Sequence, residues 1–197
     1  MKPSLDKSIK YFIFIRHFST KWNEANKLQG VKDINIKKID KKKVLKLQNK
    51  INNIKKNFNE KNINYFSSNL KRSIQTALKL SFKNLNINNN LNEYNFGKFE
   101  GLDKKKTFSK LKFDKRFCKI HGNEEKKSIL QRIETFLGGI QTKSLNICIV
   151  HGMWLRFLYL SLKKKNIQSL FRTNLPNGCI VTLVFKNKMN YKIKLLR

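Results

Sequence analysis

Two histidines stand directly after apolar runs in this sequence. Arg16 and His17 follow the run Tyr11–Ile15, and His151 follows the run Leu145–Val150. An imidazole can act as a nucleophile or carry a proton near neutral pH, and a guanidinium binds anionic oxygens with paired hydrogen bonds. The combination therefore indicates chemistry on an anionic substrate, provided that the fold brings the two positions together.

The elements around these residues predict such a meeting. Short aromatic and β-branched runs indicate buried strands, at Tyr11–Ile15, Asn64–Ser67 and Leu145–Val150. Apolar residues at three- and four-residue spacing indicate helices within 40–58 and 129–140. Strands that alternate with helices predict an α/β fold, a single-domain sandwich with a mainly parallel central sheet flanked by helices. In such sheets the ligand site lies beyond the carboxyl ends of the strands, which is where both histidines stand.

The remaining segments complete this outline. We expect a helix through Arg72–Leu78, a loop around a weak strand at Asn84–Asn92, partial helix in Leu102–Lys119 and a helix at Met153–Leu162. The last two strands are expected at Ile180–Phe185 and Tyr191–Leu195, joined by a polar loop. Gly138 and Gly139 are placed where a helix would end.

Five blocks, in order along the chain, resemble the signature of the histidine phosphatase superfamily, which includes phosphoglycerate mutases, fructose-bisphosphatases and α-ribazole phosphatases. The blocks are RHFSTKWN at 16–23, NKLQG at 26–30, SSNLKRSIQTA at 67–77, LNEYNFGKFEG at 91–101, and VHG at 150–152 followed by Arg156. A Gly-Asn-Glu turn at 122–124 resembles, more weakly, a turn of the smaller members. The chain is thereby identified as resembling that family, with a phosphoglycerate mutase-like fold over residues 1–197 as one domain.

The resemblance implies a role for each matching residue. His17 would attack phosphorus and form a phosphohistidine, while Arg16 and Arg72 hold the phosphoryl oxygens. His151 would donate to the transition state, and Glu93 would protonate the leaving oxygen and then activate water. Asn23 and Gly152 complete the expected substrate-binding set, together with Phe18. The resemblance implies no metal and no cofactor.

Several neighbouring residues have a second interpretation. Glu100 is the alternative acid, and His121 is expected at the surface. Structural roles are expected for a further set of residues of the signature blocks, Thr20, Trp22, Gln75, Thr76 and Arg156.

Phe18 stands where the family has glycine. Glycine allows unusual backbone angles and close approach to a ligand, whereas phenylalanine adds a β-carbon and a ring. Two positions for that ring are equally compatible with the sequence. It is either a wall of the substrate pocket that contacts a ring on the leaving group, or it fills core space behind the loop.

Composition limits the other classes of function. The chain has 197 residues and a formal net charge of +32. Lysines are spread over every segment, so we expect biased composition and no specific nucleic-acid partner, although the charge should attract anions. Cys118, Cys148 and Cys179 lack metal-ligand spacing. No apolar run is long enough to span a membrane and Met1–Lys7 lacks a signal peptide's apolar segment, so a cytoplasmic protein is expected, as a monomer or a dimer.

The function expected from the sequence is hydrolysis of a small phosphomonoester. A cofactor-dependent phosphoglycerate mutase is the first alternative, although only 57 residues lie between Glu93 and His151, which leaves little room for the insertion usual in mutases. A catalytically impaired regulatory member of the same fold is the second. The sequence leaves the substrate open among α-ribazole 5′-phosphate, sugar phosphates and phosphoproteins.

Overall fold

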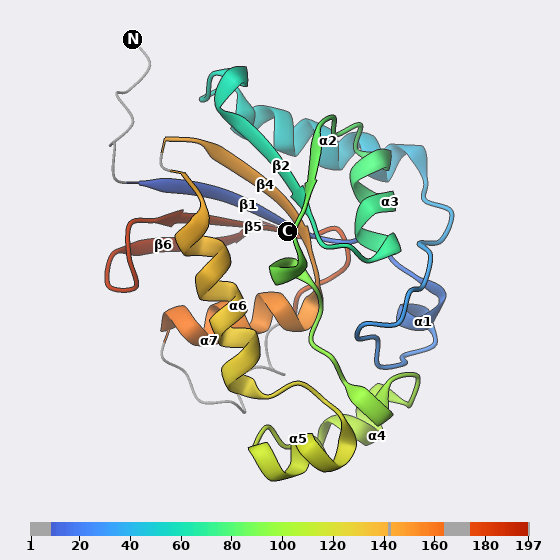
Figure 1. Ribbon diagram of the computed structural model, residues 1–197. Coiled ribbons are helices and arrows are strands. Elements are labelled where there is room, and N and C mark those ends of the chain that lie inside the picture. Colours follow the sequence, from blue (N-terminus) through green and yellow to red (C-terminus); the bar gives the residue numbers. More distant parts are fainter. Residues whose placement is uncertain (1–8, 142, 164–173, 197) are drawn as a thin grey trace.

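A computed structural model describes residues 9–141, 143–163 and 174–196, and it places one mixed sheet at the centre of the molecule (Figure 1). The interpretation of Met1–Lys7 lies outside the described residues. The sheet has the order β3-β2-β4-β1-β5-β6. Its strands are β1 (Lys10–Arg16), β2 (Ile63–Ser67), β3 (Leu85–Ile87), β4 (Leu145–Val150), β5 (Ile180–Phe185) and β6 (Tyr191–Leu196).

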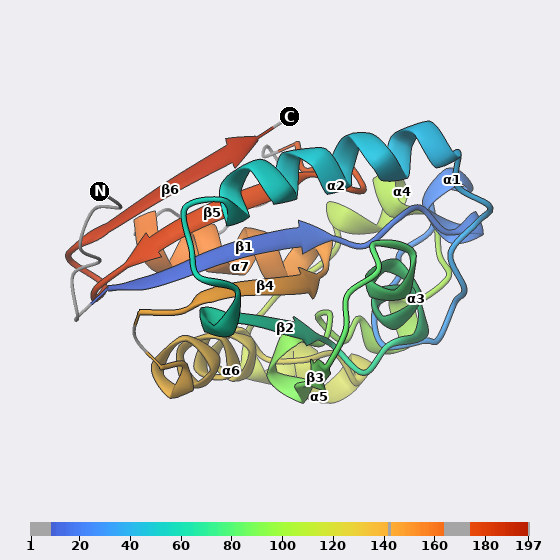
Figure 2. The same cartoon turned by 90° about the horizontal axis from the view of Figure 1, so that it is seen from above.

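Most of the sheet is parallel. The strands β1, β2, β3 and β4 run in one direction, whereas β5 is antiparallel to both β1 and β6. The arrows of β1, β2 and β4 in Figure 2 point the same way, toward α1, α3 and α4. The expected α/β class with a mainly parallel sheet is confirmed, and each expected strand is present.

Helices cover both faces of the sheet. One face carries α2 (Lys41–Lys55) and α3 (Lys71–Lys79), and the other carries α6 (Lys126–Gly139) and α7 (Gly152–Lys163) (Figures 1 and 2). Strand β1 supplies both layers, because successive side chains of a strand point to opposite faces. Phe12 and Phe14 pack toward α6 and α7, while Ile13 and Ile15 pack toward α2 and α3.

Shorter helices connect these layers. Their bounds are α1 (Lys21–Glu24), η1 (Glu60–Asn62), η2 (Asn89–Leu91), η3 (Gly97–Phe99), α4 (Lys104–Phe108) and α5 (Lys115–His121). The lysine-rich segment 102–119 is thus helical in two pieces, each begun by an aspartate. Asp103 accepts a hydrogen bond from the backbone of Lys106, and Asp114 accepts one from Phe117, which satisfies backbone donors at each helix start.

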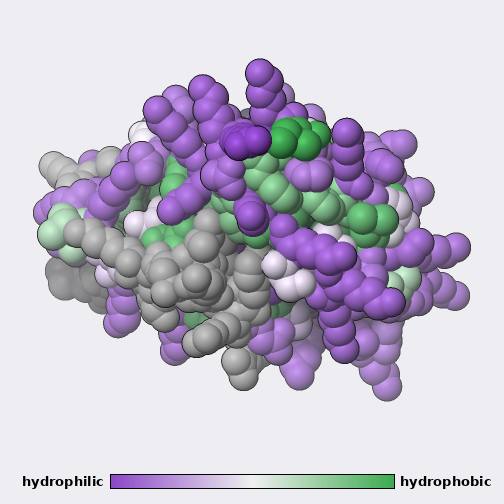
Figure 3. All heavy atoms as spheres, turned by 90° about the horizontal axis from the view of Figure 1, so that it is seen from below, coloured by the Kyte–Doolittle hydropathy of each residue, from purple (hydrophilic) through white to green (hydrophobic). Residues whose placement is uncertain are grey.

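The surface reflects the composition. The face seen from below is mainly hydrophilic, with smaller hydrophobic areas between the polar side chains (Figure 3). The three cysteines are buried, and none of them forms a disulfide bond. Within the described part of the chain, no helix has both the length and the apolar character needed to cross a membrane.

Candidate active site

The register of two neighbouring strands brings the two histidines together. Strands β1 and β4 pair in parallel, with Arg16 opposite Val150, so that His17 and His151 are the next residues on each strand. The backbone N–H of His17 donates to the carbonyl of Val150 at 3.0 Å, and the two imidazole ring centres are 5.1 Å apart. The sequence expectation that both histidines meet at one edge of the sheet therefore holds in the structure.

A pocket opens beside His17 at this edge. Of the residues expected from the sequence, Arg16, His17, Asn23, Glu93 and Gly152 line it. The lining is completed by a group that includes three further cations: Lys27, Leu28, Gln29, Phe96, Lys104, Phe108, Met153 and Arg156. Among the described residues, no group of three or more histidine, cysteine or acidic side chains has the arrangement of a metal site.

His17 is held as a neutral base. Its Nδ1 lies 2.7 Å from the carbonyl oxygen of Phe18. A carbonyl can only accept, so Nδ1 carries the ring proton and Nε2 keeps its lone pair. Burial, and then the charges of Arg72 and Arg16, hold the pKa of His17 well below its usual value near 6.5. The ring can therefore offer an unprotonated nitrogen to an electrophile at neutral pH.

The same burial predicts acid sensitivity of the fold. Burial also lowers the pKa of His151 well below 6.5, with contributions from Arg72 and His17. The unfolded chain would take up protons on both histidines below about pH 6.5 while the folded chain would not, so stability should fall as pH falls through that value. Each histidine adds a slope of up to ~1.4 kcal/mol per pH unit.

Urea titrations at pH 7.5 and pH 5.5 measure this effect. His17→Asn should reduce the loss of unfolding free energy between the two pH values by up to about half, because one of two titrating groups is gone. A wild-type free energy of unfolding that is equal at both pH values would contradict buried neutral histidines.

Arg72 and His151 lie behind His17 and do not line the pocket. The guanidinium of Arg72 donates to the carbonyls of Gly30 and Lys32 at 2.6 and 2.9 Å, and its Nε–H donates to Nδ1 of His151 at 3.3 Å. Since Nδ1 of His151 accepts there, its Nε2–H is the donor toward the hydroxyl of Ser68, 2.7 Å away. Both side chains are fully buried. They therefore act on His17 through packing and through the charge of Arg72.

Arg16 retains a free donor next to the pocket. Its Nη1 donates to the carbonyl of Leu175 at 2.5 Å, while its buried Nε has no hydrogen-bond partner among the described residues. Gly152 lets the Arg16 guanidinium lie close to the backbone at position 152, because a β-carbon there would be 3.2 Å from the guanidinium. A buried donor without a partner costs free energy, and the oxygen of a bound anion would remove this cost by accepting the missing hydrogen bond.

Asn23 is fixed by the loop that follows His17. Its side-chain oxygen accepts from the backbone of Thr20 and from the amide of Asn177, which leaves the Asn23 amide nitrogen as the group available to a ligand. Thr20 in turn caps α1, so its expected structural role is confirmed. The hydroxyl of Thr76 accepts from the backbone of Phe18 and donates to the carbonyl of Arg72, and it too is structural.

The two candidate acids occupy different environments. The carboxylate of Glu93 lines the pocket and accepts from the backbone N–H groups of Met153 and Trp154, at the start of α7. Glu100 instead accepts from the backbones of Val31 and Lys32 at 2.8 and 2.9 Å, and it does not line the pocket. The geometry therefore separates Glu93, next to His17, from Glu100, which braces a loop.

Comparison with known proteins identifies the family. The model of the histidine phosphatase superfamily (branch 1) matches residues 12–196. The chain belongs to the histidine phosphatase superfamily. A search of curated protein sequences gave no match.

Several solved structures share the fold. A phosphoglycerate mutase from Bacillus anthracis has 18% identity and a TM-score of 0.73, with 97% of this chain and 94% of that one covered. A mycobacterial glucosyl-3-phosphoglycerate phosphatase has 16% identity and a TM-score of 0.67, with coverage of 95% and 97%. The protein TTHB049 from Thermus thermophilus has 21% identity and a TM-score of 0.63, with coverage of 88% and 92%.

Phe18, the departure from the superfamily's glycine, does not form a wall of the pocket that holds His17. Its ring is 6% exposed and packs with Leu47, Ile51 and Ile180 in the core layer under α2. The course of the backbone explains the position of the ring, because the N–H of Phe18 donates a hydrogen bond to Thr76 on α3. The substrate-wall interpretation of Phe18 is therefore wrong for the pocket that holds His17, and the ring lies in the core layer behind the loop, as the second interpretation expected.

The sequence reasoning missed a lysine of this histidine phosphatase pocket. Lys104 lies at the start of α4, and burial, followed by the charges of Arg16 and Arg156, lowers its pKa to about 8. It is one of three consecutive lysines, and no pattern in the sequence separates it from Lys105 and Lys106. Arg156, expected to be structural, donates to the carbonyl of Gly152 and also lines the pocket.

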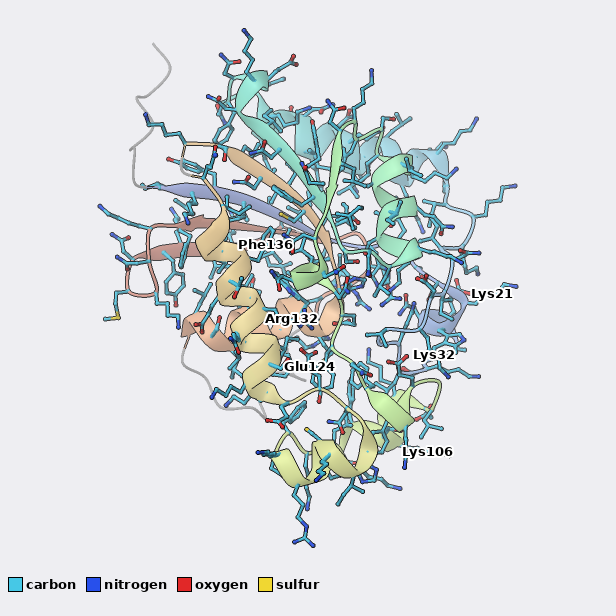
Figure 4. The ribbon with its side chains drawn as sticks, in the orientation of Figure 1. Lys21, Lys32, Lys106, Glu124, Arg132 and Phe136 are labelled. Carbon is cyan, nitrogen blue, oxygen red and sulfur yellow. The ribbon has the colours of Figure 1, made fainter. Side chains whose placement is uncertain are left out.

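A half-buried ion pair behind Glu93 was also missed. Arg132 on α6 pairs with Glu124, with 2.7 Å between Nε and Oε1, and donates to the carbonyls of Asn90 and Asn92. A weaker contact of 3.3 Å reaches the carbonyl of Glu93 itself. Both partners lie along the lower part of α6 in Figure 4. The only sequence signal was the weak Gly-Asn-Glu turn that contains Glu124.

Proposed function

We propose that this superfamily member hydrolyses a small phosphomonoester through a phosphohistidine at His17. The observation that carries the proposal is the neutral imidazole of His17, which donates its Nδ1 proton to the carbonyl of Phe18 and lines one pocket with Arg16 and Glu93. A nucleophile, an anion-binding guanidinium and a proton donor are the three groups that phosphoryl transfer to an enzyme requires.

The proposed reaction has two steps. Nε2 of His17 forms a bond to phosphorus while the bond to the ester oxygen breaks, and the leaving oxygen takes a proton from Glu93. Water then attacks the phosphohistidine and gives a proton back to the Glu93 carboxylate, which releases phosphate and free His17. Arg16 would bind the phosphoryl oxygens with its free donor, and Asn23 would add a neutral one.

Arg72 and His151 would act from behind the nucleophile. The charge of Arg72, together with burial, keeps His17 neutral. The ring of His151 lies beside that of His17, with 5.1 Å between the ring centres. A direct contact of either residue with the phosphoryl group stays a prediction from the family resemblance, and a structure with bound orthovanadate tests it.

Trapping the intermediate is the direct test. Alkaline denaturation during turnover of a ³²P-labelled phosphomonoester should leave label on the protein that survives in alkali and is lost in acid, and peptide mapping at alkaline pH should locate it at His17. Label elsewhere, or turnover with no label under single-turnover conditions, would contradict the mechanism.

A substrate panel addresses the leaving group. It should include 3-phosphoglycerate and its glucosyl derivative, because the names of two similar proteins contain these compounds. Sugar phosphates and nucleoside phosphates complete it. Release of inorganic phosphate supports a phosphatase, whereas phosphoryl exchange between 3- and 2-phosphoglycerate that depends on bisphosphoglycerate would support the mutase alternative.

Replacing Glu93 should affect substrates unequally. Glu93→Gln is expected to lower kcat on an alkyl phosphate by ~10²-fold or more, and to lower kcat on p-nitrophenyl phosphate much less, because nitrophenolate leaves without a proton. The variant should also lose ~1–2 kcal/mol of stability, since the neutral amide would not offer two acceptor oxygens to the start of α7. Equal losses on both substrates would show that Glu93 is not the acid.

A further inference from the structure

A second cavity lies on the other side of the His17 loop. It has a volume of about 390 Å³ and is enclosed by α2, the loop 174–179, the start of β5 and the end of β6. Figure 2 shows α2 alongside the end of β6 on this side of the sheet. Among the described residues, none lines both this cavity and the pocket that contains His17.

The floor of this cavity is apolar. Phe18, Leu47 and Ile180 form it, and each of the three belongs to the core layer under α2. Pro176 and Leu196 extend the same apolar lining. The volume falls within the range of pockets that hold small organic ligands, roughly 300–1,000 Å³. An apolar body placed there would leave water and gain from the hydrophobic effect.

The rim of the cavity is cationic. Lys43 and Lys46 are three residues apart on α2, so they project from the same side of the helix, and both line the cavity with exposed side chains. Lysine can lie along an apolar surface with its stem and keep its ammonium in water. An apolar floor under a cationic rim is complementary to a ligand that has an apolar body and a negative end.

Charge also selects among possible occupants. A second copy of this chain would carry the same formal charge of +32 and would be repelled from a rim of lysines. A small anion has the opposite sign. We propose that this cavity is a binding site for a small organic anion with an aromatic or acyl body, separate from the pocket that holds His17.

The walls of the cavity also hold the catalytic loop. Asn177 donates to the carbonyl of His17 at 2.9 Å, and the backbone of Gly178 donates to the carbonyl of Arg16 at 2.9 Å. The carbonyl of Phe18 fixes the ring of His17. A ligand in the cavity therefore touches the residues that orient the nucleophile, without touching the substrate.

Fluorescence titration of the full chain with 1-anilinonaphthalene-8-sulfonate tests the site. Saturable binding with a Kd below about 1 mM is expected. The uncharged analogue N-phenyl-1-naphthylamine should bind about tenfold more weakly, because it has the same apolar body and no sulfonate. Failure of the sulfonate to saturate, or equal affinity of the two probes, would overturn the proposal.

A pair of matched variants locates the bound probe. Lys43→Glu/Lys46→Glu should weaken sulfonate binding by about tenfold, ~1.4 kcal/mol. Lys41→Glu/Lys42→Glu changes the net charge by the same amount on residues of α2 that do not line the cavity, and it should have little effect. Equal weakening in both variants would mean that net charge alone attracts the probe and would overturn the site.

Orthovanadate separates this site from the proposed phosphatase pocket. The sulfonate probe should stay bound when orthovanadate is added, and displacement would place the probe beside His17 and overturn the proposal. These measurements follow binding alone, so an absence of phosphatase activity would end the proposed function and leave the test of the cavity intact.

Discussion

His17→Ala is expected to lower phosphomonoesterase activity by at least ~10⁴-fold, to the level of the uncatalysed background. The loss is large because the imidazole is the group that would bond to phosphorus, and removal of a nucleophile forfeits the whole two-step pathway. Initial rates with p-nitrophenyl phosphate and a label-trapping experiment on the same preparation measure it. Circular dichroism should report a folded protein.

His121→Ala is the matched control. His121 packs against Phe99 and Phe117, and it does not line the pocket. Its removal should leave kcat and KM within about twofold of the wild type. Activity of His17→Ala that stays within tenfold of the wild type, in a preparation free of other phosphatases, would end the phosphohistidine mechanism.

Arg72→Ala should reduce both activity and stability. The family resemblance predicts that the Arg72 charge acts on the transferring phosphoryl group. Losing such a charge typically costs ~3–4 kcal/mol, so kcat/KM should fall by more than two orders of magnitude. The carbonyls of Gly30 and Lys32 would also lose their donor. Gly30 is the buried one of the two, and an unsatisfied buried acceptor costs ~1–3 kcal/mol. Steady-state kinetics and urea denaturation measure the two effects.

Two further variants serve as controls for the losses expected in Arg72→Ala. Arg116→Ala removes one arginine from an exposed position on α5 and should change neither quantity. Arg72→Lys keeps a charge but loses the planar set of donors, so its kcat/KM should lie between those of the wild type and Arg72→Ala. A loss smaller than about fivefold in folded Arg72→Ala would show that the arginine is structural only.

The sequence was most informative where a residue follows a regular element. The run Tyr11–Ile15 and the run Leu145–Val150 are strongly apolar, so strand and edge could be predicted for His17 and His151 from composition and periodicity alone. The family blocks then added Asn23 and Glu93, both of which line the pocket.

Prediction failed where the direction of a side chain depends on tertiary packing. The sequence places Phe18 beside the nucleophile, yet a chain that turns after a strand can direct one side chain to a pocket and the next to the core. Lys104 is the reverse case, a pocket residue that was not expected. Only the placement of α4 over the pocket distinguishes Lys104 from its two lysine neighbours. The cavity under Lys43 and Lys46 combines α2 with the loop 174–179, a contact across more than a hundred residues that periodicity cannot supply.

The register of β1 and β4 has a consequence for how this site can diverge. The separation of the two imidazoles, 5.1 Å between ring centres, is close to the ~4.8 Å between any two neighbouring strands of a sheet. Backbone hydrogen bonds common to every sequence thus maintain the distance, and no particular side chain is required to space the rings. Many surface residues can therefore be replaced by lysine or asparagine without a change in the distance between the two rings. A pair of positions anchored in this way tolerates extensive drift in the rest of the chain, which is consistent with a shared fold at 16–21% identity.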